Sequence, residues 1–118
     1  MTVNITTEFK RSFALISRKS DPHLRQTARI YAYLFELDAD IRDGRVSMDY
    51  WNVQDSASGW LESQSTLRSG TPIWRLYPQH RHAIALLARF AGEIRALRIC
   101  GRRELIATER ELSSDPEL

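Results

Sequence analysis

The sequence has one cysteine, five glycines, four prolines and no long apolar run. A single cysteine excludes an internal disulfide and any zinc site built on cysteines. No apolar run approaches the ~20 residues that span a bilayer. The first residues, MTVNITTEFKR, contain no apolar signal region. The sequence therefore predicts a cytoplasmic protein without a membrane partner.

Sequence patterns that mark common enzyme sites are also missing. There is no Gly-rich phosphate loop, and Ser58-Gly59 lacks the first glycine of a Gly-x-Ser-x-Gly elbow. Cys100 is expected near a helix C-terminus, where the helix dipole disfavours a thiolate. His80 and His82 would diverge at a helix start, and no second ligand cluster accompanies them. We predict no enzymatic activity, no catalytic residues, no metal and no cofactor.

The composition is that of a folded globular protein, with 42% hydrophobic and 27% charged residues. A chain of 118 residues suits a single domain over residues 1–118, with a frayed tail at about 113–118. The net charge of +2 hides a segregation, because residues 68–103 carry eight arginines against Glu93 alone. Residues 36–62 carry seven acids against two arginines. Such blocks either pair within the fold or attract an anionic partner.

Two helices are predicted near the N-terminus. Thr6 or Thr7 caps the first helix, which ends near Lys19. Ser20, followed by Asp and Pro, caps the second helix, which continues to about Asp43 before a glycine. The second helix has a broad apolar face made of Leu24, Ala28, Tyr31, Leu34, Phe35, Leu37 and Ile41.

The middle of the chain is predicted as three strands separated by turn residues. Apolar and polar residues alternate over 45–53, residues 60–67 are a weaker second strand, and residues 73–77 are a third. A rival interpretation makes residues 56–68 a helix. Gly59 and the serines disfavour a helix interior, so strands are preferred.

Residues 82–99 are predicted as a long central helix. One apolar line along it contains Ile84, Leu87, Ala91 and Ile94. Small residues form a second stripe, Ala85, Ala88, Gly92 and Ala96, which would allow close approach within the chain or across the axis of a homodimer. Gly101 breaks the helix, and residues 102–112 form a further helical piece.

The predicted fold class is α+β. Two N-terminal helices precede a three-stranded antiparallel meander, and the long central helix packs on the sheet. An all-α bundle is the alternative.

Aromatic residues carry the first functional hypothesis, binding to another protein. All three tryptophans fall in the predicted sheet. Large aromatic and arginine side chains anchor protein interfaces, so we predict Trp51, Trp60, Trp74 and Arg75 as partner-binding residues. The alternative is that the tryptophans pack in the core.

Nucleic-acid binding through the basic stretch 68–103 is the second hypothesis. Its contact residues would be Arg68, Arg81, Arg89 and Arg95, and its affinity would fall steeply with salt. No helix-turn-helix or ribonucleoprotein signature accompanies these arginines. A small enzyme with a pocket under the helices is the third hypothesis.

Residues 30–60 read IYAYLFELDADIRDGRVSMDYWNVQDSASGW and precede a polar strand and an Ala-rich segment. With Tyr31, Tyr50 and Trp51 in this layout, residues 28–98 resemble the ArdB-type antirestriction family of plasmids and other mobile elements. The resemblance implies a non-enzymatic protein that inhibits a host restriction complex and is not a strongly acidic DNA mimic.

Overall fold

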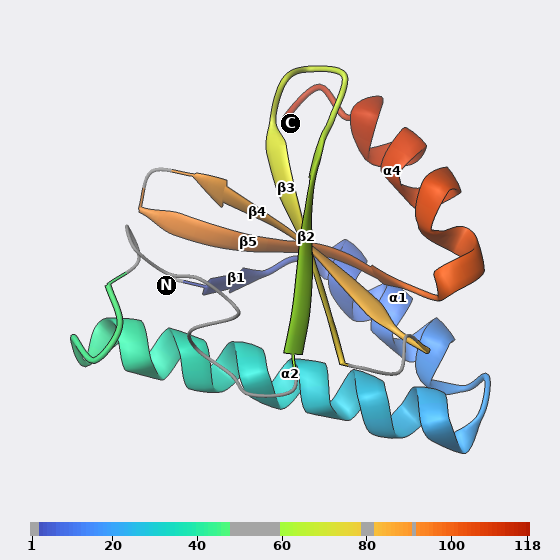
Figure 1. The fold of residues 1–118 in the computed structure, drawn as a ribbon, viewed down its shortest axis with the longest axis horizontal. Coiled ribbons are helices and arrows are strands. Elements are labelled where there is room, and N and C mark those ends of the chain that lie inside the picture. Colours follow the sequence, from blue (N-terminus) through green and yellow to red (C-terminus); the bar gives the residue numbers. More distant parts are fainter. Residues whose placement is uncertain (1–2, 48–59, 79–81, 91) are drawn as a thin grey trace.

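A computed structural model describes residues 3–47, 60–78, 82–90 and 92–118, with only the backbone described at 61–63. These residues form an α+β fold, as the sequence predicts (Figure 1). In chain order the elements are β1 (Val3–Ile5), α1 (Thr7–Ser17), α2 (Asp21–Arg42), β2 (Trp60–Thr66), β3 (Pro72–Pro78), β4 (Ile84–Phe90), β5 (Glu93–Cys100), the 3-10 helix η2 (Arg102–Glu104) and α4 (Leu105–Ser113).

The strands form one mixed, five-stranded sheet with the order β1-β5-β4-β3-β2. The pairs β2–β3, β3–β4 and β4–β5 are antiparallel. The pair β1–β5 is parallel, with Val3 opposite Ile94. The predicted three-stranded meander is therefore wrong in its extent. Its second and third strands are observed as β2 and β3, and β4, β5 and β1 complete the sheet formed by the described residues.

The two N-terminal helices begin where the sequence predicts. The hydroxyl oxygen of Thr6 accepts a hydrogen bond from the N–H of Phe9 at 3.1 Å. The hydroxyl of Ser20 likewise accepts from the N–H of His23 at 3.3 Å. Each bond satisfies a backbone donor that has no partner within the helix. Beyond α2, Gly44 has a φ of +76°, the left-handed conformation that favours glycine at helix ends.

The predicted central helix over residues 82–99 is wrong, because this segment forms the β4–β5 hairpin. Gly92 lies at the turn with a φ of +79°, which glycine adopts without the steric cost that a Cβ brings. The small-residue stripe is not one surface. Ala85 belongs to the core cluster on one face of the sheet and Ala88 to the cluster on the other. The all-α alternative is wrong for the same reason.

The middle segment is partly as predicted. Strands β2 and β3 confirm the second and third predicted strands, and the rival helix over 56–68 is wrong over residues 60–66. Residues 45–47 form a turn and bend after α2, not the start of a strand. The rest of the predicted first strand and its following turn lie within 48–59, outside the described residues.

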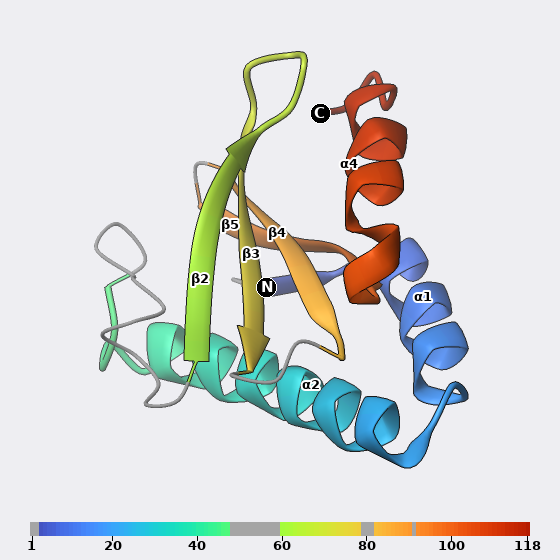
Figure 2. The same cartoon turned by 45° about the vertical axis from the view of Figure 1, so that its right-hand side comes forward.

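Helices lie on both faces of the sheet. Helices α1 and α2 cover one face over a cluster that includes Phe9, Ile30 and Leu87. Helix α4 covers part of the other face, where Leu112 packs with Leu86 (Figure 2). Because both faces of β4 are covered, its residues from Ile84 to Ala88 are all buried. The strand therefore reads as a continuous apolar run without alternation.

Candidate functional site

A cavity of about 290 Å³ lies between the β2–β3 turn and α4. In Figure 2 this turn rises beside the C-terminal half of α4. The N–H of Arg68, in the turn, donates a long hydrogen bond of 3.4 Å to the hydroxyl of Ser113 at the end of α4. The cavity is lined by Thr66, Leu67, Arg68, Ile106, Glu109, Arg110, Ser113 and Ser114.

Two arginines at the cavity supply positive charge. The side chains of Arg68 and Arg110 are exposed, and neither forms an ion pair with another residue of the described chain. The acid of the cavity, Glu109, is held by Arg75 of β3 through bonds of 2.6 Å (Nε to Oε1) and 2.9 Å (Nη2 to Oε2). Hydrogen bonding to Glu109 raises the pKa of Arg75. Arg75 thus neutralises the charge of the Glu109 carboxylate, and Arg68 and Arg110 leave the cavity with a net positive charge.

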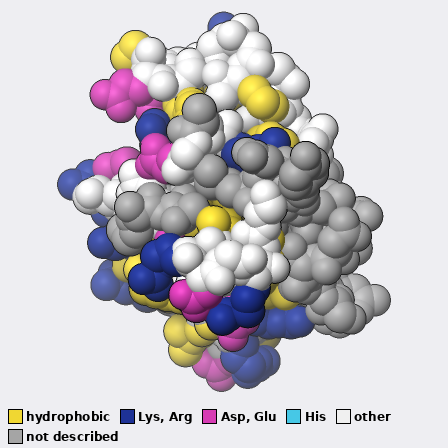
Figure 3. Space-filling view, turned by 90° about the vertical axis from the view of Figure 1, so that its left-hand side faces the viewer, with side chains coloured by type: hydrophobic (Ala, Val, Ile, Leu, Met, Phe, Trp, Pro, Cys, Tyr) yellow, Lys and Arg dark blue, Asp and Glu magenta, His cyan; other side chains and the backbone are white. Residues whose placement is uncertain are grey.

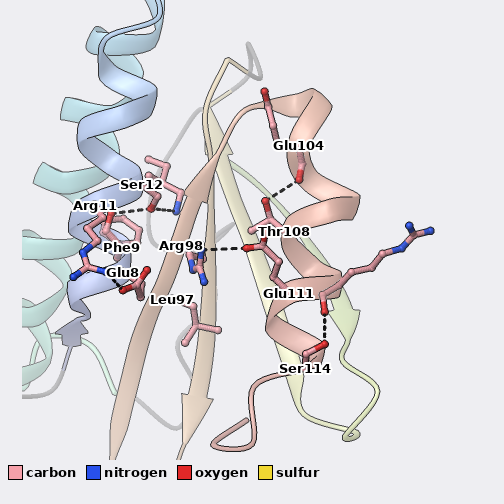
Figure 4. A network of polar contacts seen from close by, with 12 residues as sticks. Glu8, Phe9, Arg11, Ser12, Leu97, Arg98, Glu104, Thr108, Glu111 and Ser114 are labelled. Carbon is pink, nitrogen blue, oxygen red and sulfur yellow. Dashed lines mark hydrogen bonds and ion pairs between the residues drawn. The ribbon is translucent and has the colours of Figure 1, made fainter.

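Neutral groups complete the lining. Hydroxyls of Thr66, Ser113 and Ser114 provide donors and acceptors. The Ser114 hydroxyl donates to the carbonyl of Arg110 at 3.3 Å (Figure 4). Ile106 is 67% exposed and offers an apolar surface. Guanidinium and hydroxyl groups beside an apolar side chain suit an anionic ligand that also has an apolar part.

The predicted nucleic-acid residues do not gather in one place. Arg81 lies outside the described residues. Arg89 lies over the ring of Trp74 at 5.8 Å, on the sheet face that α1 and α2 cover. Arg95 bonds Glu93 at 3.1 Å and lies 4.4 Å from the Phe90 ring centroid. Its Nε is buried and has no hydrogen-bond partner in the described part of the chain.

Of the predicted arginines that lie within the described residues, only Arg68 lines the cavity, where the fold brings it beside Arg110. The prediction missed Arg110 because it considered the basic stretch 68–103 alone. Helical spacing could have pointed to it, since Ile106, Arg110 and Ser113 share one face of the predicted last helix.

The predicted partner-binding residues lie in different surroundings. Trp51 is outside the described residues. Trp60 is buried, with its ring 4.9 Å from that of Tyr33 and the guanidinium of Arg29 at 4.9 Å above it. Trp74 is half-buried beside Arg89, and Arg75 is held by Glu109. Their role in binding a partner stays a prediction.

The structure describes Cys100 and two of the three histidines. Cys100 is buried at the end of β5, not at a helix terminus, and burial raises the pKa of its thiol to about 11. His82 contacts His23 with ring centroids 5.2 Å apart, and burial, followed by the charge of His82, lowers the pKa of His23. His80 lies outside the described residues. In the part of the chain that is described, no three His, Cys, Asp or Glu side chains are grouped to hold a metal ion.

The surface charge is mixed over the face shown in Figure 3, where Lys and Arg side chains gather in the lower half among Asp and Glu. Opposite charges also pair between elements. On the α4 side of the sheet, Arg98 of β5 points toward Glu111 of α4 at 3.4 Å (Figure 4). None of the helices in the described segments is both long and apolar enough to cross a membrane.

Comparison of the chain with models of known protein families, with curated proteins and with solved structures finds no match. The ArdB-type resemblance, and the inhibition of a restriction complex that it implies, therefore stay predictions.

Proposed function

We propose that the chain binds single-stranded nucleic acid at the cavity between the β2–β3 turn and α4. The observation that carries the proposal is the pair of exposed arginines, Arg68 and Arg110, on either side of a hydroxyl-lined cavity. Guanidinium groups bind phosphate oxygens through paired hydrogen bonds. Two such groups suit consecutive phosphates or a phosphate and its sugar. The proposal concerns binding, and the absence of enzymatic activity stays a prediction.

The concave form of the site favours single strands. A duplex is read mainly by an element that projects into a groove, such as a helix or a two-stranded ribbon. A cavity of about 290 Å³ instead accepts a nucleotide that is not stacked in a duplex. The exposed Ile106 side chain gives such a base an apolar contact, while the Thr and Ser hydroxyls face its sugar or phosphate.

The test is a fluorescence-anisotropy titration of labelled single-stranded RNA and DNA 12-mers, with the matching duplexes, at about 50 and 200 mM salt. Single strands should bind more tightly than duplexes, and the affinity should fall with salt because phosphate contacts release counterions. Arg68→Ala and Arg110→Ala should each weaken binding and reduce the slope of log affinity against log salt by about one.

Arg25→Ala is the matched control, because Arg25 is also an exposed arginine and belongs to α2, which covers the opposite face of the sheet from α4. It should leave binding of the 12-mers unchanged. The proposal is refuted if the wild-type chain does not bind single strands at about 50 mM salt. It is also refuted if the Arg68→Ala/Arg110→Ala double variant binds as tightly as the wild type.

A further inference from the structure

Three hydroxyl groups line the cavity between the β2–β3 turn and α4, on Thr66, Ser113 and Ser114. A hydroxyl has one O–H donor and two acceptor lone pairs. What each group offers a ligand therefore depends on the bonds that it already makes within the chain. These bonds differ among the three, so each hydroxyl suits a different part of a nucleotide.

The Ser114 hydroxyl offers a ligand only acceptors. Its O–H donates to the carbonyl of Arg110 at 3.3 Å, so its two lone pairs remain (Figure 4). An ionised phosphate oxygen has no proton to donate, and neither has a sugar in the middle of a DNA strand. The 2′-hydroxyl of a ribose does have one. Within the sugar-phosphate backbone, the partner that suits Ser114 is therefore a 2′-hydroxyl.

Ser113 and Thr66 keep their O–H groups for a ligand. The Ser113 hydroxyl accepts the N–H of Arg68 at 3.4 Å and donates to no other residue of the described chain. The Thr66 hydroxyl is exposed on β2 and has no partner among the described residues. A 2′-hydroxyl is both a donor and an acceptor. The neighbouring serines complement it, since it donates to Ser114 and accepts from Ser113.

The end of α4 disfavours a phosphate beside these serines. Ser113 is the last residue of α4 and Ser114 is its C-cap. The free carbonyl groups of the last turn give a helix C-terminus a partial negative charge. Asp115, the next residue, is exposed and adds a full negative charge. A bound phosphate is therefore directed to the guanidinium groups of Arg68 and Arg110, and the serines are left to the neutral sugar.

We propose that the cavity selects RNA over DNA by binding a ribose 2′-hydroxyl between Ser113 and Ser114. The inference rests on the proposed binding of single strands at the same cavity and names the kind of strand. A DNA strand makes the same phosphate contacts but leaves the two serines without this partner. Because Ser114 is exposed to water, the preference should be about tenfold, the contribution of one or two hydrogen bonds.

The test compares three labelled single-stranded 12-mers of one base sequence by fluorescence anisotropy, at about 50 mM salt and with the full chain. They are RNA, DNA with uracil in place of thymine, and 2′-fluoro RNA. RNA should bind about tenfold more tightly than DNA. The 2′-fluoro strand keeps the sugar shape of RNA but has no O–H, so it should bind like DNA. Amino groups of the bases are the same in all three strands and do not contribute to the ratio.

The variants are judged by the ratio of the RNA affinity to the DNA affinity. Ser113→Ala and Ser114→Ala should each weaken RNA binding by about three- to tenfold and leave DNA binding nearly unchanged. Thr108→Val is the matched control. The Thr108 hydroxyl also donates to a carbonyl four residues earlier on α4, that of Glu104 at 2.7 Å, but it does not line the cavity (Figure 4). This variant should keep the wild-type ratio.

The outcomes separate this inference from the proposed function. Equal affinity for RNA and DNA, with both lost in Arg68→Ala/Arg110→Ala, overturns the RNA preference and leaves single-strand binding at the cavity standing. Tight binding of the 2′-fluoro strand overturns the preference for an O–H in favour of recognition of the sugar shape. A wild-type ratio in Ser113→Ala/Ser114→Ala overturns the role of the serines. Failure of all three strands to bind overturns both proposals.

Discussion

The ion pair between Arg75 and Glu109 should be the main polar bond that holds α4 against the sheet. The two side chains are 26% and 16% exposed, and two short bonds join the guanidinium to the carboxylate. Hydrogen bonds to charged groups contribute about 1.5–3 kcal/mol each. Glu109→Gln keeps the shape and one acceptor but removes the charge. We expect it to lower the free energy of unfolding by about 2 kcal/mol, roughly a thirtyfold change in the unfolding equilibrium.

The matched control lies on the same helix. Glu111 is 64% exposed and meets Arg98 at 3.4 Å, so its ion pair is screened by solvent. Glu111→Gln should change the free energy of unfolding by less than about 0.5 kcal/mol. Urea denaturation followed by circular dichroism measures both variants, and hydrogen exchange shows whether α4 amides lose protection before those of β4.

A double-mutant cycle with Arg75→Met tests whether the two residues act together. Arg75→Met alone leaves Glu109 charged and only 16% exposed, so the double variant should lose less than the sum of the single losses. The reasoning is refuted if Glu109→Gln costs no more than Glu111→Gln. Additive single losses would show that the pair contributes no coupling.

Three further predictions concern the β4–β5 hairpin. Gly92→Ala should lower the free energy of unfolding by about 1 kcal/mol in urea denaturation, because a Cβ is strained at a φ of +79°; an unchanged midpoint would contradict this. Cys100 should not react with a thiol reagent at pH 8 until the chain unfolds, since burial raises its pKa to about 11; rapid labelling of the native chain would be inconsistent. Hydrogen bonds from Arg95 and Asn4 lower the pKa of Glu93, so its stabilisation is present above the unfolded pKa of about 4.3 and is lost as the pH falls through the lower folded pKa. Glu93→Gln should therefore flatten acid denaturation below about pH 4.3, and an identical pH profile would argue against it.

The sequence predicted the elements whose signals are local. Caps at Thr6 and Ser20 located α1 and α2, and turn residues bounded β3. Helical spacing over residues 102–112 is confirmed by η2 and α4. Each of these signals depends on neighbours within a few residues, so tertiary packing is not needed to recognise them.

The β4–β5 hairpin could not be recognised from local signals. Its apolar pattern depends on the helices that pack on both faces of β4. A strand buried on both faces shows an unbroken apolar run, which resembles a buried helix. A register shift between Leu86 and Leu87 further disturbs the alternation. The spacing of the small residues places Gly92 on a helix face, whereas its positive φ puts it at the hairpin turn. The three-residue strand β1 is too short to give a pattern of its own.

The candidate site was predictable only in part. Arg68 belongs to the predicted basic stretch. Its neighbour at the cavity, Arg110, comes from α4, which follows more than forty residues later and packs on the face of the sheet opposite α1 and α2. The same is true of the exposed apolar side chains on α2. The sequence shows that Leu24 and Phe35 are apolar, whereas only the packed fold shows that the sheet leaves them uncovered.

The parallel pairing of β1 with β5 has a consequence for how the chain is made. The Thr6 hydroxyl donates to the carbonyl of Ala96 at 2.8 Å, across 90 residues of sequence. At a synthesis rate of about 5–20 residues per second, β5 is synthesised roughly 5–20 seconds after β1. During that time the apolar faces of α1 and α2 also lack the sheet that covers them. The N-terminal segment therefore joins the sheet late, and the nascent chain is most exposed to wrong partners until the final hairpin closes.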